Sequence, residues 1–187
     1  MNIPTRGLFL AAIMTAGLLL GPNANAEDKV DGTVLLTVTG EIMNTNRGGY
    51  DPDTDKFFGY NEVDFAKAAQ FDFDALEALE SVKVNADFPK GEQVYEFEGP
   101  LLVDVLKAAG ATGETVTMQA LDGYAIEVPL SELEAAGAVL ALKRDGEAFG
   151  IGGFGPTQIV FPRADRADLS EMPDDNWIWS IFHISVE

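Results

Sequence analysis

Residues 98–128 read EGPLLVDVLKAAGATGETVTMQALDGYAIEV, and this stretch decides the fold class. In its first half, apolar residues recur every three to four positions, which predicts a helix over residues 99–110 with one buried face. Pro100 suits the first turn of this helix and Gly110 suits its C-terminal end.

The second half of the stretch alternates apolar and polar residues. The alternation predicts strands over residues 115–121 and 124–128, joined at Asp122-Gly123, a pair typical of tight hairpin turns. A short helix is expected next, over residues 129–136.

Short strands and few helices are expected along the rest of the chain. A helix should begin at Asp74, because Glu77 three residues later completes a capping box. The expected loops are residues 44–60 and an acidic segment, residues 163–175. The other expected strands are residues 33–40, 82–84, 94–98, 139–143, 149–151, 158–161 and 177–186. Together these elements predict an α+β fold with mixed β-sheets and short helices.

The N-terminus has the pattern of a secretory signal peptide. Arg6 precedes an apolar stretch over residues 7–20 that is too short to span a bilayer comfortably, and Ala24-Asn25-Ala26 fits a cleavage site. We therefore expect residues 1–26 to be removed after Ala26, and residues 27–187 to form a single periplasmic or secreted domain that is not embedded in the membrane.

The composition excludes several function classes. The chain has 31 acidic and 12 basic residues, for a net charge of −19, which argues against nucleic acid and anionic membrane surfaces as partners. It has no cysteine and one histidine, which excludes disulfides, a thiol nucleophile and a zinc site of the usual kind. His183 is expected to point outward from a C-terminal strand.

Five stretches of the chain, in order, resemble the molybdopterin-binding domain of the sulfite oxidase family. They carry its "F-x-G-x-x-L-x-D-L-L" helix, its "DGY…PL" hairpin, its "LA…DG" turn, its "GP…V-x-P" segment and its final "W…I-x-V" strand. In this sequence the stretches are Phe97–Leu106, Ala120–Leu130, Leu140–Gly146, Gly155–Pro162 and Trp179–Val186.

The family's molybdenum is held by a cysteine thiolate, and the corresponding stretch here is Asn85-Ala86-Asp87. Molybdenum in that fold needs the thiolate, so no molybdenum is expected. The sequence is similar to a cysteine-less, secreted sub-branch that is implicated in binding free pterins. That resemblance implies a non-catalytic protein that reports pterin to a membrane-bound diguanylate cyclase/phosphodiesterase, which controls cyclic di-GMP. The alternative is a molybdopterin-dependent oxidoreductase or its subunit.

A pterin site needs an acid for the ring's N–H and amino edge and aromatic planes for its faces. We expect Trp179 or Tyr124 to stack on the ring and Asp122 to pair with its amino edge, with Trp177 nearby and Arg163 at a ring carbonyl or the polyol tail. Alternatively, Asp122 only forms a turn, Tyr124 and Trp179 belong to the core, and Trp177 lies at a rim.

A second acidic segment, residues 51–62, offers a weak calcium candidate. Asp51, Asp53, Asp55 and Glu62 match positions 1, 3, 5 and 12 of an EF-hand loop, but Lys56 stands where that loop needs glycine. This leaves a calcium-stabilised interaction module as a third hypothesis for the function.

Residues 150–155 match G-x-G-x-x-G, the pattern of a dinucleotide-binding turn. A strand is expected after them, whereas that turn must lead into a helix. The glycines therefore indicate a close backbone approach, either within the chain or to a ligand.

Overall fold

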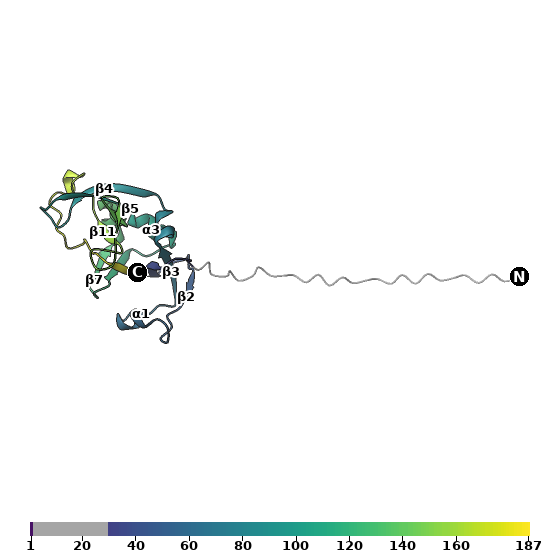
Figure 1. Ribbon diagram of the computed structural model, residues 1–187. Coiled ribbons are helices and arrows are strands. Elements are labelled where there is room, and N and C mark those ends of the chain that lie inside the picture. The colour runs from purple at the N-terminus through teal and green to yellow at the C-terminus, as the bar shows by residue number, and fades with distance from the viewer. Residues whose placement is uncertain (2–29) are drawn as a thin grey trace.

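Three β-sheets and four short α-helices make up residues 30–187, which with Met1 are the part of the chain that the computed structural model describes (Figure 1). Residues 2–26 of the expected signal peptide lie outside the described residues. Within residues 30–187, none of the helices is long and apolar enough to cross a bilayer. The predicted α+β class with mixed sheets and short helices is confirmed.

The largest sheet has six strands in the order β2-β3-β1-β12-β6-β7. The last strand, β12, lies in its middle, parallel to β1 and antiparallel to β6, while the other pairs are antiparallel. The strands are β1 (Val34–Gly40), β2 (Arg47–Gly48), β3 (Lys67–Asp72), β6 (Thr115–Ala120), β7 (Ala125–Pro129) and β12 (Ile181–Val186).

Two smaller sheets complete the fold, with strand orders β10-β9-β5-β4 and β11-β8. A Cβ at Gly99 in β5 would overlap the carbonyl of Leu140 in β8, so this glycine lets the two sheets approach closely. The strands are β4 (Ser81–Asp87), β5 (Val94–Pro100), β8 (Val139–Ala141), β9 (Lys143–Arg144), β10 (Glu147–Ala148) and β11 (Gln158–Val160).

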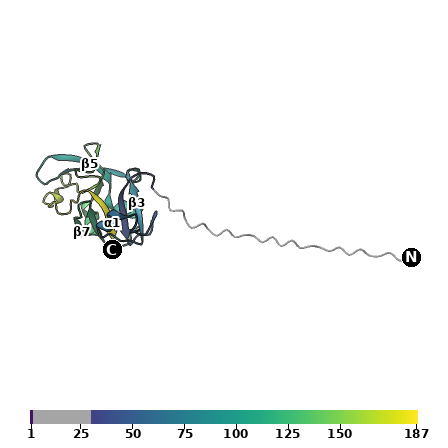
Figure 2. The ribbon, with the colours of Figure 1, turned by 60° about the horizontal axis from the view of Figure 1, so that its bottom comes forward.

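The helices are short, and three of the four α-helices follow closely after a strand. In Figure 1, α1 lies at the opposite end of the fold from β4 and β5; in Figure 2 this end comes forward. The helices are α1 (Lys56–Tyr60), α2 (Phe73–Glu77), α3 (Leu102–Ala108), α4 (Leu130–Ala136) and a 3₁₀ turn, η1 (Ala167–Leu169).

Two helix starts differ from the predicted ones. Helix α2 is capped by Asp72, whose carboxylate accepts the N–H of Ala75 at 2.8 Å, so the predicted cap at Asp74 is wrong. Helix α3 begins at Leu102 and not at Gly99, because Gly99 and Pro100 are still paired with β4. Its predicted C-terminal end is confirmed: Gly110 adopts φ +68°.

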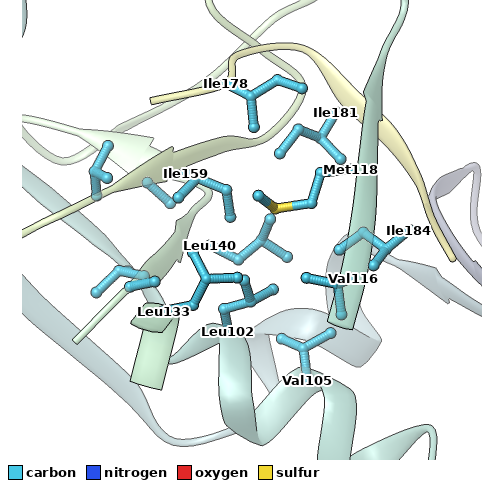
Figure 3. Packing of buried hydrophobic residues seen from close by; sticks show 14 of the residues in the cluster. Leu102, Val105, Val116, Met118, Leu133, Leu140, Ile159, Ile178, Ile181 and Ile184 are labelled. Atoms are coloured by element: carbon cyan, nitrogen blue, oxygen red, sulfur yellow. The ribbon is translucent and has the colours of Figure 1, made fainter. Parts of the chain in front are cut away.

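One hydrophobic core connects the three sheets. Figure 3 shows Met118 of β6 surrounded by Leu140 of β8, Ile159 of β11 and Ile181 of β12, with Leu102 of α3 below. All five side chains are at most 1% exposed. The predicted apolar face of α3 therefore packs where the sheets meet and fixes their arrangement.

The predicted loop over residues 44–60 contains β2 and α1, and β3 was not predicted at all. The predicted strand over residues 149–151 is also wrong, because the two-residue strand β10 forms just before it. The predicted strand over residues 177–186 is interrupted at Ser180, which has φ +54°. Strand β12 therefore starts at Ile181, and residues 177–179 are not part of it.

Candidate functional site

Four of the five predicted pterin residues line one pocket of about 440 Å³ at the end of the β6–β7 hairpin. We call it the aromatic–acidic pocket. Its walls come from the end of β4, the hairpin turn and the segment before β12, and are formed by Phe88, Pro89, Ala120, Asp122, Tyr124, Asp174, Asp175, Trp177, Ile178 and Trp179. The size is within the usual range for small-molecule sites.

Backbone hydrogen bonds hold two of these walls together. The N–H of Leu121 donates to the carbonyl of Ser180 at 2.9 Å, which places the hairpin turn beside Trp179. Ser180 is itself fixed, because its N–H donates to Phe154 O at 2.9 Å and its hydroxyl donates to Gly155 O at 2.6 Å. These bonds account for the left-handed conformation of Ser180 and end the strand prematurely at the pocket.

The hairpin turn itself forms as predicted. Gly123 adopts φ +88°, and the Asp122 carboxylate accepts the N–H of Tyr124 at 3.0 Å. This turn uses one carboxylate oxygen of Asp122, while no other side-chain bond engages the second oxygen within the described chain. Asp122 is thus both a turn residue and a side chain that faces the pocket.

The two tryptophans have different environments. Trp177 is 2% exposed and stacks on Phe88, with ring centroids 5.4 Å apart and planes 8° apart. The guanidinium carbon of Arg163 lies 4.4 Å from the centroid of the Trp177 ring. The faces of Trp177 are therefore committed to the protein. Trp179 and Tyr124 are 39% and 52% exposed, so these two rings are the aromatic planes that a ligand can reach.

Arg163 does not lie in the pocket as predicted but behind Trp177, where it is 4% exposed. Its Nε donates to Asp87 Oδ1 at 2.7 Å, and one Nη donates to Asp174 Oδ1 at 2.7 Å and to Met172 O at 2.8 Å. The other Nη bonds the carbonyl of Asp87. With its donors used internally, Arg163 joins β4 to the acidic loop and supports the pocket without touching its contents.

Three carboxylates border the pocket, and they differ in availability. Both oxygens of Asp174 are engaged, one by Arg163 and one by the N–H of Lys90 at 2.8 Å. Asp175 is exposed and makes no hydrogen bond to any described residue. Asp175 is a candidate that sequence reasoning missed; its only signal was its place two residues before Trp177.

Buried polar atoms without partners lie close to the pocket. Neither polar side-chain atom of Gln158 has a hydrogen-bond partner among the described residues, nor does Nε1 of Trp177. Gln158 forms an isolated antiparallel bridge with Trp179, and the N–H of the next residue along, Ile159, donates to the carbonyl of Ile178 at 2.8 Å. This antiparallel pairing places Gln158 directly opposite Trp179, which is a pocket residue.

Asn85-Ala86-Asp87, the stretch at which the resemblance places a cysteine, directly precedes Phe88 of the pocket. Ala86 is fully buried at the end of β4, and Asn85 bonds Asp165 through its backbone and side-chain nitrogens at 2.6 and 3.0 Å. Burial raises the pKa of Asp87, but bonds from Gly91 N and Arg163 outweigh it and lower that pKa below its ordinary value. Phe88 lines the pocket but was not among the predicted site residues. Its position directly after Asn85-Ala86-Asp87 was the sequence signal that could have identified it as a site residue.

The structure does not form the predicted calcium loop. Asp55 is paired with Arg47 and accepts the N–H of Asp51 at 2.8 Å, while Asp51 accepts the N–H of Asp53 at 2.9 Å. No three Asp, Glu or His side chains of residues 30–187, Glu62 included, gather as metal ligands would. These carboxylates stabilise the turn that leads into α1.

His183 is buried, and the prediction that it points outward is wrong. It is 6% exposed in β12, with Nε2 2.8 Å from the hydroxyl of Thr39 and the ring of Phe58 nearby. Burial lowers the pKa of His183 to about 4, so the imidazole is neutral at ordinary pH. It lies outside the aromatic–acidic pocket.

The glycine-rich stretch makes its close approach within the chain. A Cβ at Gly155 would overlap Phe149 and the carbonyl of Gly150, whereas Gly150, Gly152 and Gly153 have open space around them. No helix follows, as expected, since β11 begins at Gln158. The stretch is a tight turn, not a dinucleotide-binding element.

Comparison with solved structures supports the fold. The crystal structure of the sulfane dehydrogenase SoxCD from Paracoccus pantotrophus matches 81% of this chain with a TM-score of 0.54 and 13% sequence identity. The match covers 37% of that chain, so this protein spans little more than a third of the enzyme it resembles. No family model and no curated protein matches the sequence.

Proposed function

We propose that this protein binds a pterin in the aromatic–acidic pocket and does so without catalysis. One observation carries the proposal: the two exposed rings, Trp179 and Tyr124, border a pocket in which Asp122 and Asp175 have unengaged carboxylate oxygens. Flat, donor-rich heterocycles need this combination of aromatic planes and acids.

The chemistry of the ligand sets its orientation. The N–H and amino group of a pterin form a paired donor edge like that of arginine, and one carboxylate accepts both bonds. Asp122 and Asp175 are the acids for this edge, while Trp179 or Tyr124 covers a ring face. An apolar ring without donors would leave these carboxylates desolvated and unpaired, which selects against it.

The residues at the metal position do not fit molybdenum. The family's thiolate has no counterpart, because Ala86 has no donor, Asn85 is tied to Asp165, and Asp87 is tied to Arg163. The pocket also lacks a histidine, since His183 lies elsewhere in the described fold. We therefore favour binding over the alternative of a molybdopterin-dependent oxidoreductase.

The cellular role rests on the resemblance and on the N-terminal sequence. A secreted pterin binder must pass its signal on through a protein contact, and a membrane-bound diguanylate cyclase/phosphodiesterase is the partner that the resemblance implies. The exposed apolar side chains of Phe57, Tyr60 and Ile151 offer contact surface for such a partner. Cyclic di-GMP measured in cells with the wild-type protein or the Trp179→Ala variant tests this role.

Binding is tested by titrating the purified domain with biopterin while following tryptophan fluorescence and the melting temperature. Stacking on one aromatic ring contributes about 1–3 kcal/mol, so Trp179→Ala should weaken binding about 5- to 150-fold. Tyr60→Ala is the matched control, because this ring is exposed but lies outside the pocket. No quenching and no melting shift at saturating biopterin would reject the proposal.

A further inference from the structure

Arg144 stands apart from the other cations of the described chain. Every other lysine and arginine in residues 30–187 donates a side-chain hydrogen bond to a neighbouring residue, whereas Arg144 donates none and forms no ion pair. In a chain with a net charge of −19, an arginine without an acidic partner is unusual. All five guanidinium donors are available to a ligand.

The guanidinium is nevertheless held in place. Its Cζ lies 4.6 Å from the ring centroid of Tyr95 and 5.7 Å from that of Phe154, so two aromatic rings fix it by cation–π contacts. The backbone of Arg144 is paired with Phe97 in β5 and Glu147 in β10. These contacts position the guanidinium without using any of its hydrogen-bond donors.

Arg144 lines a second pocket, which lies next to the aromatic–acidic pocket. This second pocket, of about 480 Å³, is lined by Arg144, Glu147, Phe154 and the glycine-rich turn, where Gly150 and Gly153 leave open space. Glu147 is exposed and makes no ion pair with Arg144. The pocket thus holds a pre-positioned cation with room beside it.

A single aromatic ring separates the two pockets. Phe154 lines the second pocket and contacts both Trp179, at 6.3 Å between centroids, and Phe88, at 5.5 Å, which line the first. The first pocket is bordered by carboxylates, while the second offers Arg144. A ligand that extends past Phe154 would therefore meet acids at one end and a cation at the other.

We propose that Arg144 and the glycine-rich turn form a subsite for an oxyanion on the tail of the ligand, with phosphate as the best fit. This inference rests on the proposed pterin function and extends it: the donor edge of the ring faces Asp122 and Asp175, and the tail passes Phe154 to reach Arg144. The planar guanidinium fork matches phosphate oxygens with two parallel bonds. The site therefore selects pterins by their tails.

The test compares neopterin with neopterin monophosphate, which differ only in the phosphate. Charge-assisted hydrogen bonds of this kind should make the wild-type protein bind the monophosphate about tenfold more tightly. Arg144→Gln should abolish the preference, so that it binds both compounds equally, and Arg144→Lys should keep part of the preference. Glu147→Gln is the control and should leave or raise the preference, and the melting temperature of each variant verifies folding.

Free inorganic phosphate separates a tail subsite from a general anion site. In excess, it should compete with the monophosphate and leave neopterin binding unchanged. Equal affinities in the wild-type protein, or a preference that survives Arg144→Gln, would overturn the subsite while leaving the pterin proposal standing. If neither neopterin nor its monophosphate binds, both proposals fail.

Discussion

His183 gives the protein a measurable sensitivity to mild acid. It is the single histidine of the chain, and burial in β12 lowers its pKa to about 4 from an ordinary value of 6.5. The unfolded chain therefore takes up a proton as the pH falls below 6.5, while the folded chain takes it up only near pH 4. Stability is fully present above pH 6.5 and is lost as the pH falls through this window.

The size of the effect follows from the two pKa values. At about 1.4 kcal/mol per pKa unit, protonation of the unfolded state removes about 3 kcal/mol between pH 6.5 and 4. Such a loss is a large part of the 5–15 kcal/mol that is roughly typical of folded domains. The carboxylates with lowered pKa values, such as Asp87, titrate mostly below this window.

Urea unfolding at a series of pH values, for the wild-type protein and His183→Gln, measures this directly. The wild-type free energy of unfolding should fall by about 3 kcal/mol between pH 6.5 and 4, while His183→Gln should show a much flatter dependence there. A neutral glutamine cannot titrate, and it keeps an amide for the Thr39 hydroxyl. The same slope in both proteins, or no slope in the wild type, would refute the buried, neutral imidazole.

Three further substitutions test the supports of the fold, each measured by urea unfolding. Arg163→Met should cost about 3 kcal/mol because it leaves the partly buried Asp87 and Asp174 unpaired, whereas Arg166→Met, which breaks an exposed pair, should cost about 1 kcal/mol or less; equal costs would contradict the assignment. Gln158→Met should stabilise the ligand-free protein by about 1 kcal/mol, since it removes buried polar atoms without partners, and a loss of stability would show that those atoms are satisfied. Asp72→Ala should cost about 1–2 kcal/mol because it removes the cap of α2 and the bond to Gly32 N; an unchanged midpoint would argue against this cap.

Elements with a clear period could be predicted from the sequence, and elements formed by pairing could not. The β6–β7 hairpin and α4 match their predicted ranges within a residue or two, because alternation and turn residues are local signals. Strand β3, sequence KAAQFD, has no alternation or β-branched residue and forms because β1 and β2 pair with it on either side. Helix α1 has five residues, too few to show a helical period.

The same distinction applies to the pocket. Asp122 and Tyr124 could be singled out because they lie in one turn, and Trp179 because it falls in a stretch that resembles the final strand of the sulfite oxidase family. The place of Arg163 was not, because Asp87 is 76 residues away in the chain and only the fold brings the two together. Asp175 could not be identified for a similar reason: in an acidic loop, no local pattern marks which carboxylates line a pocket.

A crystal structure of the protein with saturating biopterin would show directly where the ring binds. We expect the bicyclic ring in the aromatic–acidic pocket, against Trp179 or Tyr124, with its amino edge within hydrogen-bond distance of Asp122 or Asp175. A ring bound elsewhere, or a pocket filled only by solvent at saturating ligand, would contradict this expectation.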